Sequence, residues 1–142
     1  MTPLSFSKSI DINAAPDAVL AVMSDVERWP EWTASVTSIK RLDAGPFVIG
    51  SRASIRQPKL PPALWTVSAI EPRRSFTWIS KGPGILVTAH HSIDPRASGS
   101  RVTLSIRYEG LLAKLVAWMT KDINERYLAM EANGLKARCE RG

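Results

Sequence analysis

Hydrophobic and polar positions alternate with a period of two over residues 6–12, and this pattern predicts a first β-strand. A short helix over residues 17–23 is expected to follow. Pro16 suits the first helical position, where its missing N–H costs nothing, and Asp17 favours the positive end of the helix dipole. The chain therefore begins with a strand that leads into a helix.

Ser24 and Glu27 have the spacing of a capping box, in which each side chain satisfies a backbone donor beside the other residue. This spacing predicts a second short helix that starts at Ser24 and ends near Trp32. Two short helices thus follow the first strand.

The pattern then changes to short strands bounded by proline- and glycine-rich turns. These turns are mostly too short to contain crossover helices, so successive strands should pair antiparallel as a meander. With the first strand they form a curved seven-stranded sheet. The six further strands are expected at residues 36–42, 52–57, 64–70, 75–80, 85–93 and 101–108.

After Gly110 apolar residues recur every three to four positions, which predicts one long C-terminal helix. Its first turns, residues 111–119, are apolar nearly all round; they are either buried by the sheet and short helices or form an apolar lid or membrane-touching segment. Nine residues cannot span a bilayer. The inner face carries Leu112, Leu115, Met119, Ile123, Tyr127, Met130 and Gly134, and the outer face carries Lys121, Asp122, Glu125, Arg126, Glu131, Lys136 and Arg138.

These elements form one α+β domain over residues 1–142. A helix about 10 Å across cannot cover the concave face of a strongly twisted seven-stranded sheet. Large side chains must fill the remaining space, or it stays open as an apolar cavity.

The composition excludes several other classes of protein. A net charge of +6 invites a nucleic-acid interpretation, but the basic residues are spread over strands and turns, which favours a solvated surface. Cys139 is the only cysteine, so an internal disulfide is excluded. The N-terminus has no long apolar run, so we expect a cytoplasmic protein without stable membrane insertion. We expect the protein to be a monomer or a homodimer.

Candidate chemistry is limited to a few side chains. His90 and His91 are the only histidines, and as neighbours in a strand they point to opposite faces, which argues against a shared metal site. If Ile93 faces the core, the alternation also places His91, Ala89 and Val87 on the inner face, so His91 is the best polar candidate inside the domain. No cofactor motif is present.

The aromatic residues on inward phases could either pack the core or line a ligand site. Tyr108 and Tyr127 add hydroxyl groups that can orient a polar group of a ligand. The candidate ligand-binding residues are Trp65, Phe76, Trp78, His91, Tyr108, Met119 and Tyr127, and the candidate catalytic residues are His91 and Tyr108.

The element order and two motifs resemble the polyketide cyclase/dehydrase family of the START/Bet v 1-like (SRPBCC) superfamily. The motifs are Ile12-Asn13-Ala14-Ala15-Pro16-Asp17-Ala18-Val19 and Ser24-Asp25-Val26-Glu27-Arg28-Trp29-Pro30-Glu31-Trp32. The resemblance covers essentially the whole chain and implies the helix-grip fold, in which a curved antiparallel sheet wraps a long C-terminal helix. Similar proteins include lipid carriers, quinone-binding proteins and aromatase/cyclases, so the resemblance restricts the chemistry only weakly.

Three functions follow from these observations. The first is binding or transport of a small hydrophobic ligand, such as a lipid, a polyketide or a quinone-like molecule. The second is a cyclase or dehydratase in which His91 and a tyrosine assist proton transfer. The third is a protein- or membrane-interaction module that uses the basic surface and the apolar residues 111–119.

Overall fold

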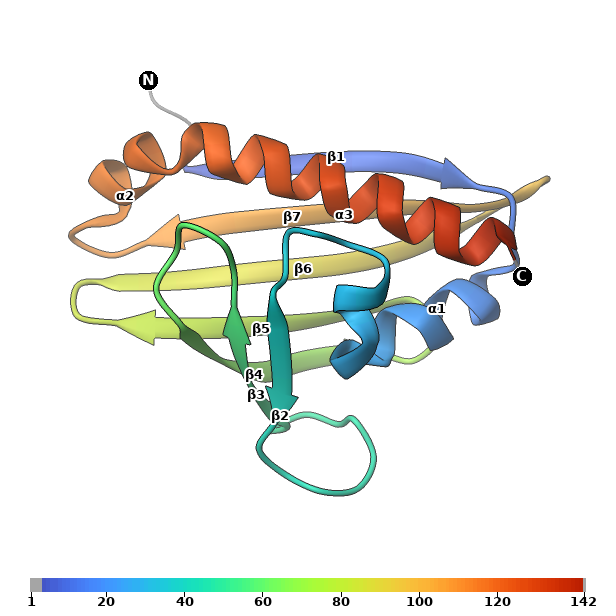
Figure 1. The fold of residues 1–142 in the computed structure, drawn as a ribbon, viewed down its shortest axis with the longest axis horizontal. Helices are drawn as coiled ribbons and strands as arrows, with labels where there is room; N and C mark the ends of the chain where they lie inside the picture. Colours follow the sequence, from blue (N-terminus) through green and yellow to red (C-terminus); the bar gives the residue numbers. More distant parts are fainter. Residues whose placement is uncertain (1–3, 142) are drawn as a thin grey trace.

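The computed structural model describes residues 4–141, in which a seven-stranded antiparallel sheet curves around a C-terminal helix (Figure 1). Residues 1–3, which belong to the N-terminal stretch interpreted above as lacking a long apolar run, lie outside the described part. The sheet order is β1-β7-β6-β5-β4-β3-β2, so the first strand closes the meander beside the last. The strands are β1 (Ser5–Ile12), β2 (Ser38–Arg41), β3 (Arg52–Arg56), β4 (Ala63–Glu71), β5 (Ser75–Gly82), β6 (Ile85–Arg96) and β7 (Gly99–Glu109); the helices are α1 (Pro16–Ser24), the 3-10 helix η1 (Val26–Glu31), α2 (Ala113–Met119) and α3 (Lys121–Arg141).

The predicted helix-grip architecture is confirmed. β6 and β7 are each three residues longer than predicted, and β2 is three residues shorter. The breaker-rich residues 94–99 were expected to form a turn, but β6 continues to Arg96 and β7 starts at Gly99. A two-residue connection suffices because Gly99 adopts a φ of 145°. The two longest strands therefore form one long hairpin between β1 and β5.

The predicted capping box at Ser24 is wrong. Ser24 is the last residue of α1, and the 3-10 helix η1 begins at Val26 with no side-chain cap on Asp25. The carboxylate of Glu27 instead accepts a hydrogen bond from the backbone N–H of Arg41, at 3.0 Å. The side chain that would have closed the capping box thus connects η1 to β2.

The single long C-terminal helix is also corrected, because it is divided at Thr120 into α2 and α3. The Thr120 hydroxyl donates to the Val116 carbonyl at 2.6 Å, and the residue has a ψ of 8°, outside the helical range. Figure 1 shows α2 set at an angle beyond the end of α3, which lies along the concave face of the sheet. Of the predicted helix, only α3 is the long element that the sheet wraps.

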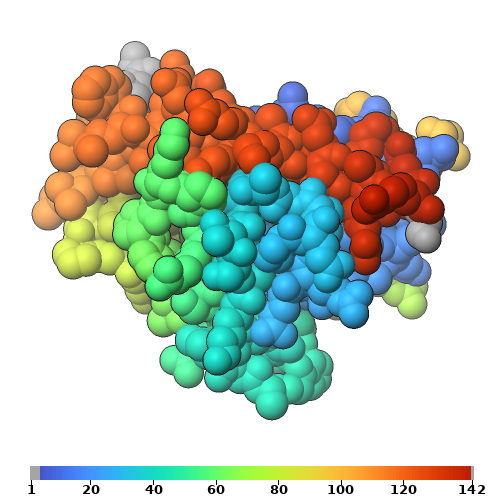
Figure 2. All heavy atoms as spheres, in the orientation of Figure 1, coloured from blue at the N-terminus to red at the C-terminus, as the bar shows by residue number. Residues whose placement is uncertain are grey.

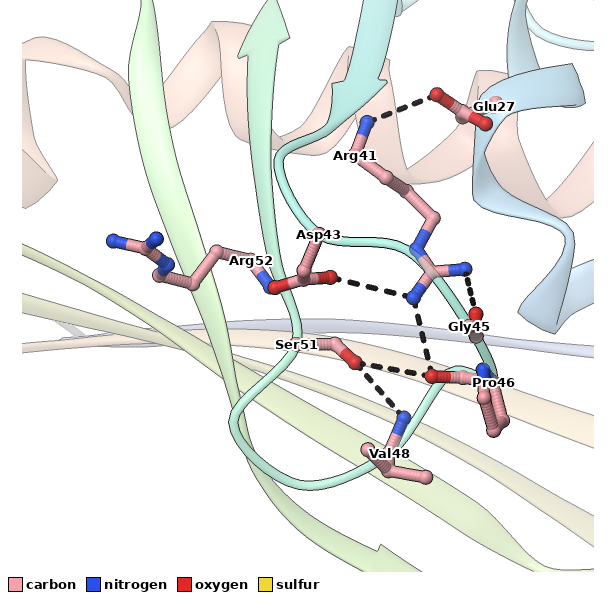
Figure 3. A network of polar contacts seen from close by, with 8 residues as sticks. All are labelled: Glu27, Arg41, Asp43, Gly45, Pro46, Val48, Ser51 and Arg52. Carbon is pink, nitrogen blue, oxygen red and sulfur yellow. Dashed lines mark hydrogen bonds and ion pairs between the residues drawn. The ribbon is translucent and has the colours of Figure 1, made fainter.

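The β2–β3 loop projects from the edge of the sheet and is organised by Arg41 (Figure 3). The Arg41 guanidinium donates to the carbonyl oxygens of Gly45 and Pro46, at 2.7 and 3.1 Å, and forms an ion pair with Asp43. Phe47 in this loop packs edge-on against the core ring of Phe76, with ring centroids 5.1 Å apart. Hydrogen bonds from Arg41 therefore fix the shape of the loop, and the Phe47 ring attaches it to the hydrophobic core.

Candidate ligand-binding cavity

A cavity of about 280 Å³ lies between the concave face of the sheet, α3 and the residues that follow β3. Its wall is mostly aromatic and aliphatic, with a few polar side chains. The lining residues are Trp29, Val36, Ile55, Gln57, Leu60, Pro61, Ala63, Trp65, Trp78, Ser80, Val87, Ala89, His91, Leu104, Ser105, Ile106, Tyr108, Val116, Thr120, Asn124, Tyr127, Leu128 and Glu131.

The floor of the cavity is built by the inward row of β6, as the alternation predicted. Val87, Ala89 and His91 all line the cavity, and His90 lies on the other face, bonded to Thr77. The small side chain of Ala89 lies between Trp78 on β5 and Ile106 on β7, its partners in register. This position leaves room at the centre of the sheet.

His91 is a buried, neutral histidine in the cavity wall. Its ring stacks on Phe76, with centroids 4.2 Å apart and planes 12° apart. Its Nδ1 lies 3.3 Å from the Phe76 carbonyl oxygen, which can only accept, so Nδ1 carries the proton and Nε2 is an acceptor. Burial lowers the pKa of His91 to about 3, because the charged imidazolium would lose its hydration.

A second polar group joins β7 to the start of α3. Asn124 Nδ2 donates to the Tyr108 hydroxyl at 2.8 Å and to Thr120 Oγ1 at 3.1 Å. All three residues line the cavity. These side chains are largely satisfied by one another, so the cluster positions the α2–α3 junction and presents little free hydrogen-bonding capacity.

The residues between β3 and β4 form the rim of the cavity. The Tyr127 hydroxyl on α3 donates to the Pro58 carbonyl and so attaches this segment to the helix. Pro61 is exposed to solvent and also lines the cavity, which places the boundary between cavity and solvent here. In Figure 2 the same segment, drawn in green, reaches the orange and red helices.

Glu131 on α3 is the only carboxyl group in the cavity wall formed by the described residues. Burial raises the pKa of Glu131 to about 7, and a hydrogen bond with the Ser35 hydroxyl opposes this effect. Ser35 is itself buried and bonded to Thr33 at 2.7 Å. The cavity thus contains a carboxyl group that is about half ionised near neutral pH.

Five of the predicted ligand-binding residues meet in the cavity wall, and two do not. Phe76 is buried behind His91, in the core. Met119 is wrongly predicted to face inward: its side chain is 65% exposed, because the break at Thr120 turns α2 away from the period of α3. The residues in the wall are Trp65, Trp78, His91, Tyr108 and Tyr127.

Sequence reasoning missed Asn124 and assigned Glu131 to the outer face of the helix. Both follow from the helical period, because Asn124, Leu128 and Glu131 are spaced by four and three positions and share one stripe. Their polarity concealed the periodicity. The signal that could have identified both residues is their position on the same helix face as the apolar Leu128.

The described residues contain no group of three or more histidine, cysteine, aspartate or glutamate side chains able to hold a metal ion. Cys139 is half-buried, away from the cavity wall, and burial raises the pKa of its thiol. The titratable groups of the cavity wall formed by the described residues are therefore His91, Glu131 and the hydroxyl groups of Tyr108 and Tyr127.

A curved sheet that closes on a C-terminal helix around an apolar cavity defines a helix-grip domain. The chain belongs to the family described as polyketide cyclase / dehydrase and lipid transport, whose model matches residues 3–140. Among curated proteins, none matches the sequence.

Solved structures with low sequence identity have the same fold. The chain is similar to a START superfamily protein from Mycobacterium smegmatis, with a TM-score of 0.79 and 16% identity over 96% of this chain and 97% of that one. It is also similar to the di-domain aromatase/cyclase StfQ from the steffimycin biosynthetic pathway, with a TM-score of 0.80 and 12% identity over 97% of this chain and 51% of that one. Major latex-like protein 151 from Panax ginseng gives a TM-score of 0.76 and 15% identity over 95% and 96%.

Proposed function

We propose that this protein binds a small hydrophobic molecule in the cavity between α3 and the sheet. The observation that carries the proposal is the wall itself, where three tryptophan rings and aliphatic side chains surround a few polar groups. Ligand sites typically combine a mostly apolar wall with a small number of oriented polar groups. The family description, which includes lipid transport, supports the same function.

The cavity volume limits the size of the ligand. A volume of about 280 Å³ lies at the lower end of the range of roughly 300–1,000 Å³ that ligand sites span. A small ring system or one short acyl or isoprenoid chain fits this space. A lipid with two long chains exceeds it, so binding of such a lipid would require α2 or the rim to move.

The first experiment is native mass spectrometry of freshly purified protein, followed by organic extraction of whatever is bound. We expect a mass increment that disappears on extraction and an apolar compound in the extract. A protein that carries no increment and also fails to take up N-phenylnaphthylamine, a neutral apolar fluorophore, would contradict the proposal.

A cyclase or dehydratase is the second candidate. Glu131 favours it, since a cavity carboxyl group with a pKa of about 7 suits general acid–base catalysis at neutral pH. Glu131 would exchange the proton, and His91, whose low pKa of about 3 makes it a weak base, would accept a hydrogen bond from a substrate hydroxyl group through Nε2. Tyr108 would turn its hydroxyl from Asn124 Oδ1 to a substrate carbonyl group. The similarity to an aromatase/cyclase is a likeness of fold and transfers no residue to this chain.

The catalytic candidate is tested with poly-β-ketone substrates and the variants His91→Ala, Tyr108→Phe and Glu131→Gln. An enzyme that uses these groups should lose at least about tenfold in kcat in each variant. Unchanged turnover in all three would exclude the mechanism. A third candidate, membrane interaction, is considered below; a cytoplasmic location and the monomeric or homodimeric state stay predictions.

None of the helices within residues 4–141 is long and apolar enough to cross a membrane.

A further inference from the structure

The cavity wall formed by the described residues contains one acidic side chain and no lysine or arginine. Glu131 is in the wall, whereas no lysine or arginine of the described chain lines the cavity. The ion pairs found among residues 4–141 do not include Glu131. The cavity thus has one acidic group and no basic group to neutralise it.

His91 is the only other group in the wall that could become a cation. The low pKa of about 3, caused by its burial, keeps it uncharged in the physiological range. Tyr108 and Tyr127 are the remaining titratable side chains of the wall. A negatively charged ligand group would therefore meet no counter-charge, and it would face the Glu131 carboxylate in a medium of low polarity.

We propose that the cavity selects apolar molecules whose polar end is uncharged or is a protonated amine, and that it rejects molecules ending in a carboxylate or phosphate. The proposal rests on the proposed binding function and assigns the selection to Glu131. An amine would pair with the Glu131 carboxylate, and a hydroxyl or carbonyl group would bond to either of its protonation states.

The test compares three probes with the same chain, 1-octanol, octylamine and octanoate, as competitors for bound N-phenylnaphthylamine at pH 8. Wild-type protein should bind octylamine about tenfold or more tightly than octanoate, with 1-octanol in between. Glu131→Gln should reduce this preference to about threefold or less. Glu125→Gln is the matched control, because Glu125 lies on the same helix with an exposed side chain.

Equal affinities of octanoate and octylamine for the wild type would overturn the proposal. The same preference in wild type and Glu131→Gln would also overturn it, because the selection would then arise elsewhere. If N-phenylnaphthylamine fails to bind and the purified protein carries no extractable ligand, the proposed function fails instead, and the two failures are distinguishable. Loss of octylamine preference with retained fluorophore binding in Glu131→Gln supports the proposal and shows that the variant is folded.

A different observation concerns the outside of the molecule. Five large apolar side chains around α2 are exposed, with exposures of 96% for Leu111, 69% for Trp118 and 65% for Met119. We call Leu111, Leu112, Leu115, Trp118 and Met119 the α2 patch. The opposite face of α2 buries Ala113 and Ala117 and contributes Val116 to the cavity wall. Contiguous exposed apolar residues of this kind indicate an interaction surface.

The charges around the α2 patch indicate what it contacts. Residues 111–121 contain Lys114 and Lys121 and no acidic residue, and Lys81 lies in the β5–β6 hairpin whose Gly84 bonds to Leu112. Of the acidic residues that flank this stretch, Glu109 is paired with Arg107, and Asp122 follows Lys121 in the first turn of α3. An exposed tryptophan among leucines, flanked by lysines, is the composition that binds at the interface of an anionic bilayer. We infer that the α2 patch docks on an anionic lipid surface, with the cavity directly behind it.

Sedimentation with vesicles tests this inference. Binding to phosphatidylserine/phosphatidylcholine vesicles is expected at low ionic strength, with weaker binding to phosphatidylcholine alone and at high salt. The double variant Leu115→Ser/Trp118→Ser should lower the affinity about tenfold or more. Leu64→Ser, at an exposed leucine on β4, is the control that should bind normally.

Two outcomes would overturn the docking inference. The first is an affinity for anionic vesicles that is absent or equal in the wild type and the double variant. The second is a concentration-dependent dimer that the double variant abolishes, which would make the α2 patch a contact between two copies of the chain.

Discussion

His91 and Glu131 should make opposite contributions to the pH dependence of the free energy of unfolding. Folding lowers the pKa of His91 from its ordinary value of 6.5 to about 3, because the ring is buried. Below pH 6.5 the unfolded chain binds a proton that the folded chain refuses, so stability falls as the pH falls. Between pH 7 and pH 5 this linkage removes about 2 kcal/mol.

Glu131 acts in the other direction over the same range. Folding raises its pKa from 4.5 to about 7, again through burial. Between these values the folded chain holds a proton that the unfolded chain has released, so stability rises as the pH falls. The gain from pH 7 to pH 5 is also about 2 kcal/mol. In the wild-type protein the two contributions nearly cancel.

Single variants should expose each contribution separately. The assay is urea unfolding followed by tryptophan fluorescence at pH 5 and pH 7, with each variant compared with wild type at the same pH. The free energy of unfolding of His91→Phe minus that of wild type should be about 2 kcal/mol higher at pH 5 than at pH 7. For Glu131→Gln the same difference should be about 2 kcal/mol lower at pH 5 than at pH 7. Packing changes that do not depend on pH cancel in this comparison.

His90→Phe is the control, because His90 lies next to His91 on the opposite face of β6. It should not reproduce the pH-dependent difference of His91→Phe. A stability difference between His91→Phe and wild type that is the same at both pH values would refute the account of His91. The same result for Glu131→Gln would refute the account of the cavity carboxyl group.

Three further variants test the packing around the cavity. Tyr108→Phe removes the hydroxyl that bonds to both Nδ2 and Oδ1 of the buried Asn124, leaves that side chain only its bond to Thr120, and should cost about 1–3 kcal/mol in urea unfolding; an unchanged midpoint would contradict this. Gly134→Ala places a Cβ 1.9 Å from the Trp32 carbonyl oxygen and should lower the Tm, although alanine is the better helix former; a raised Tm would show that the helix can shift freely. Arg41→Met should make the β2–β3 loop more sensitive to limited proteolysis, and equal cleavage rates would contradict its anchoring role.

Much of the fold could be predicted because strands and helices impose different periods on the sequence. The alternation over β6 placed Val87, Ala89 and His91 on one face, and the structure confirms this assignment. The switch in period after Gly110 correctly predicted a C-terminal helix. These signals are strong because burial of one face constrains every second or every third to fourth residue.

The failures arise where a polar side chain has a partner that the sequence does not reveal. Glu27 has the spacing of a capping box, but the N–H of Arg41 competes for its carboxylate after folding. Thr120 interrupts the helix because its hydroxyl bonds to the Val116 carbonyl oxygen and to the Tyr108–Asn124 pair. Glu131 looked like a solvated residue because a carboxyl group in an apolar wall is rare. Each of these positions depends on tertiary contacts.

The central claim, that the space between α3 and the sheet is a ligand site, is tested most directly by titrating N-phenylnaphthylamine into wild-type protein and the cavity-filling variant Ala89→Phe. We predict saturable binding by the wild type, with quenching of the tryptophans in the wall, and at least about tenfold weaker binding by a folded Ala89→Phe protein. Equal binding by both proteins would place the fluorophore elsewhere and contradict the account.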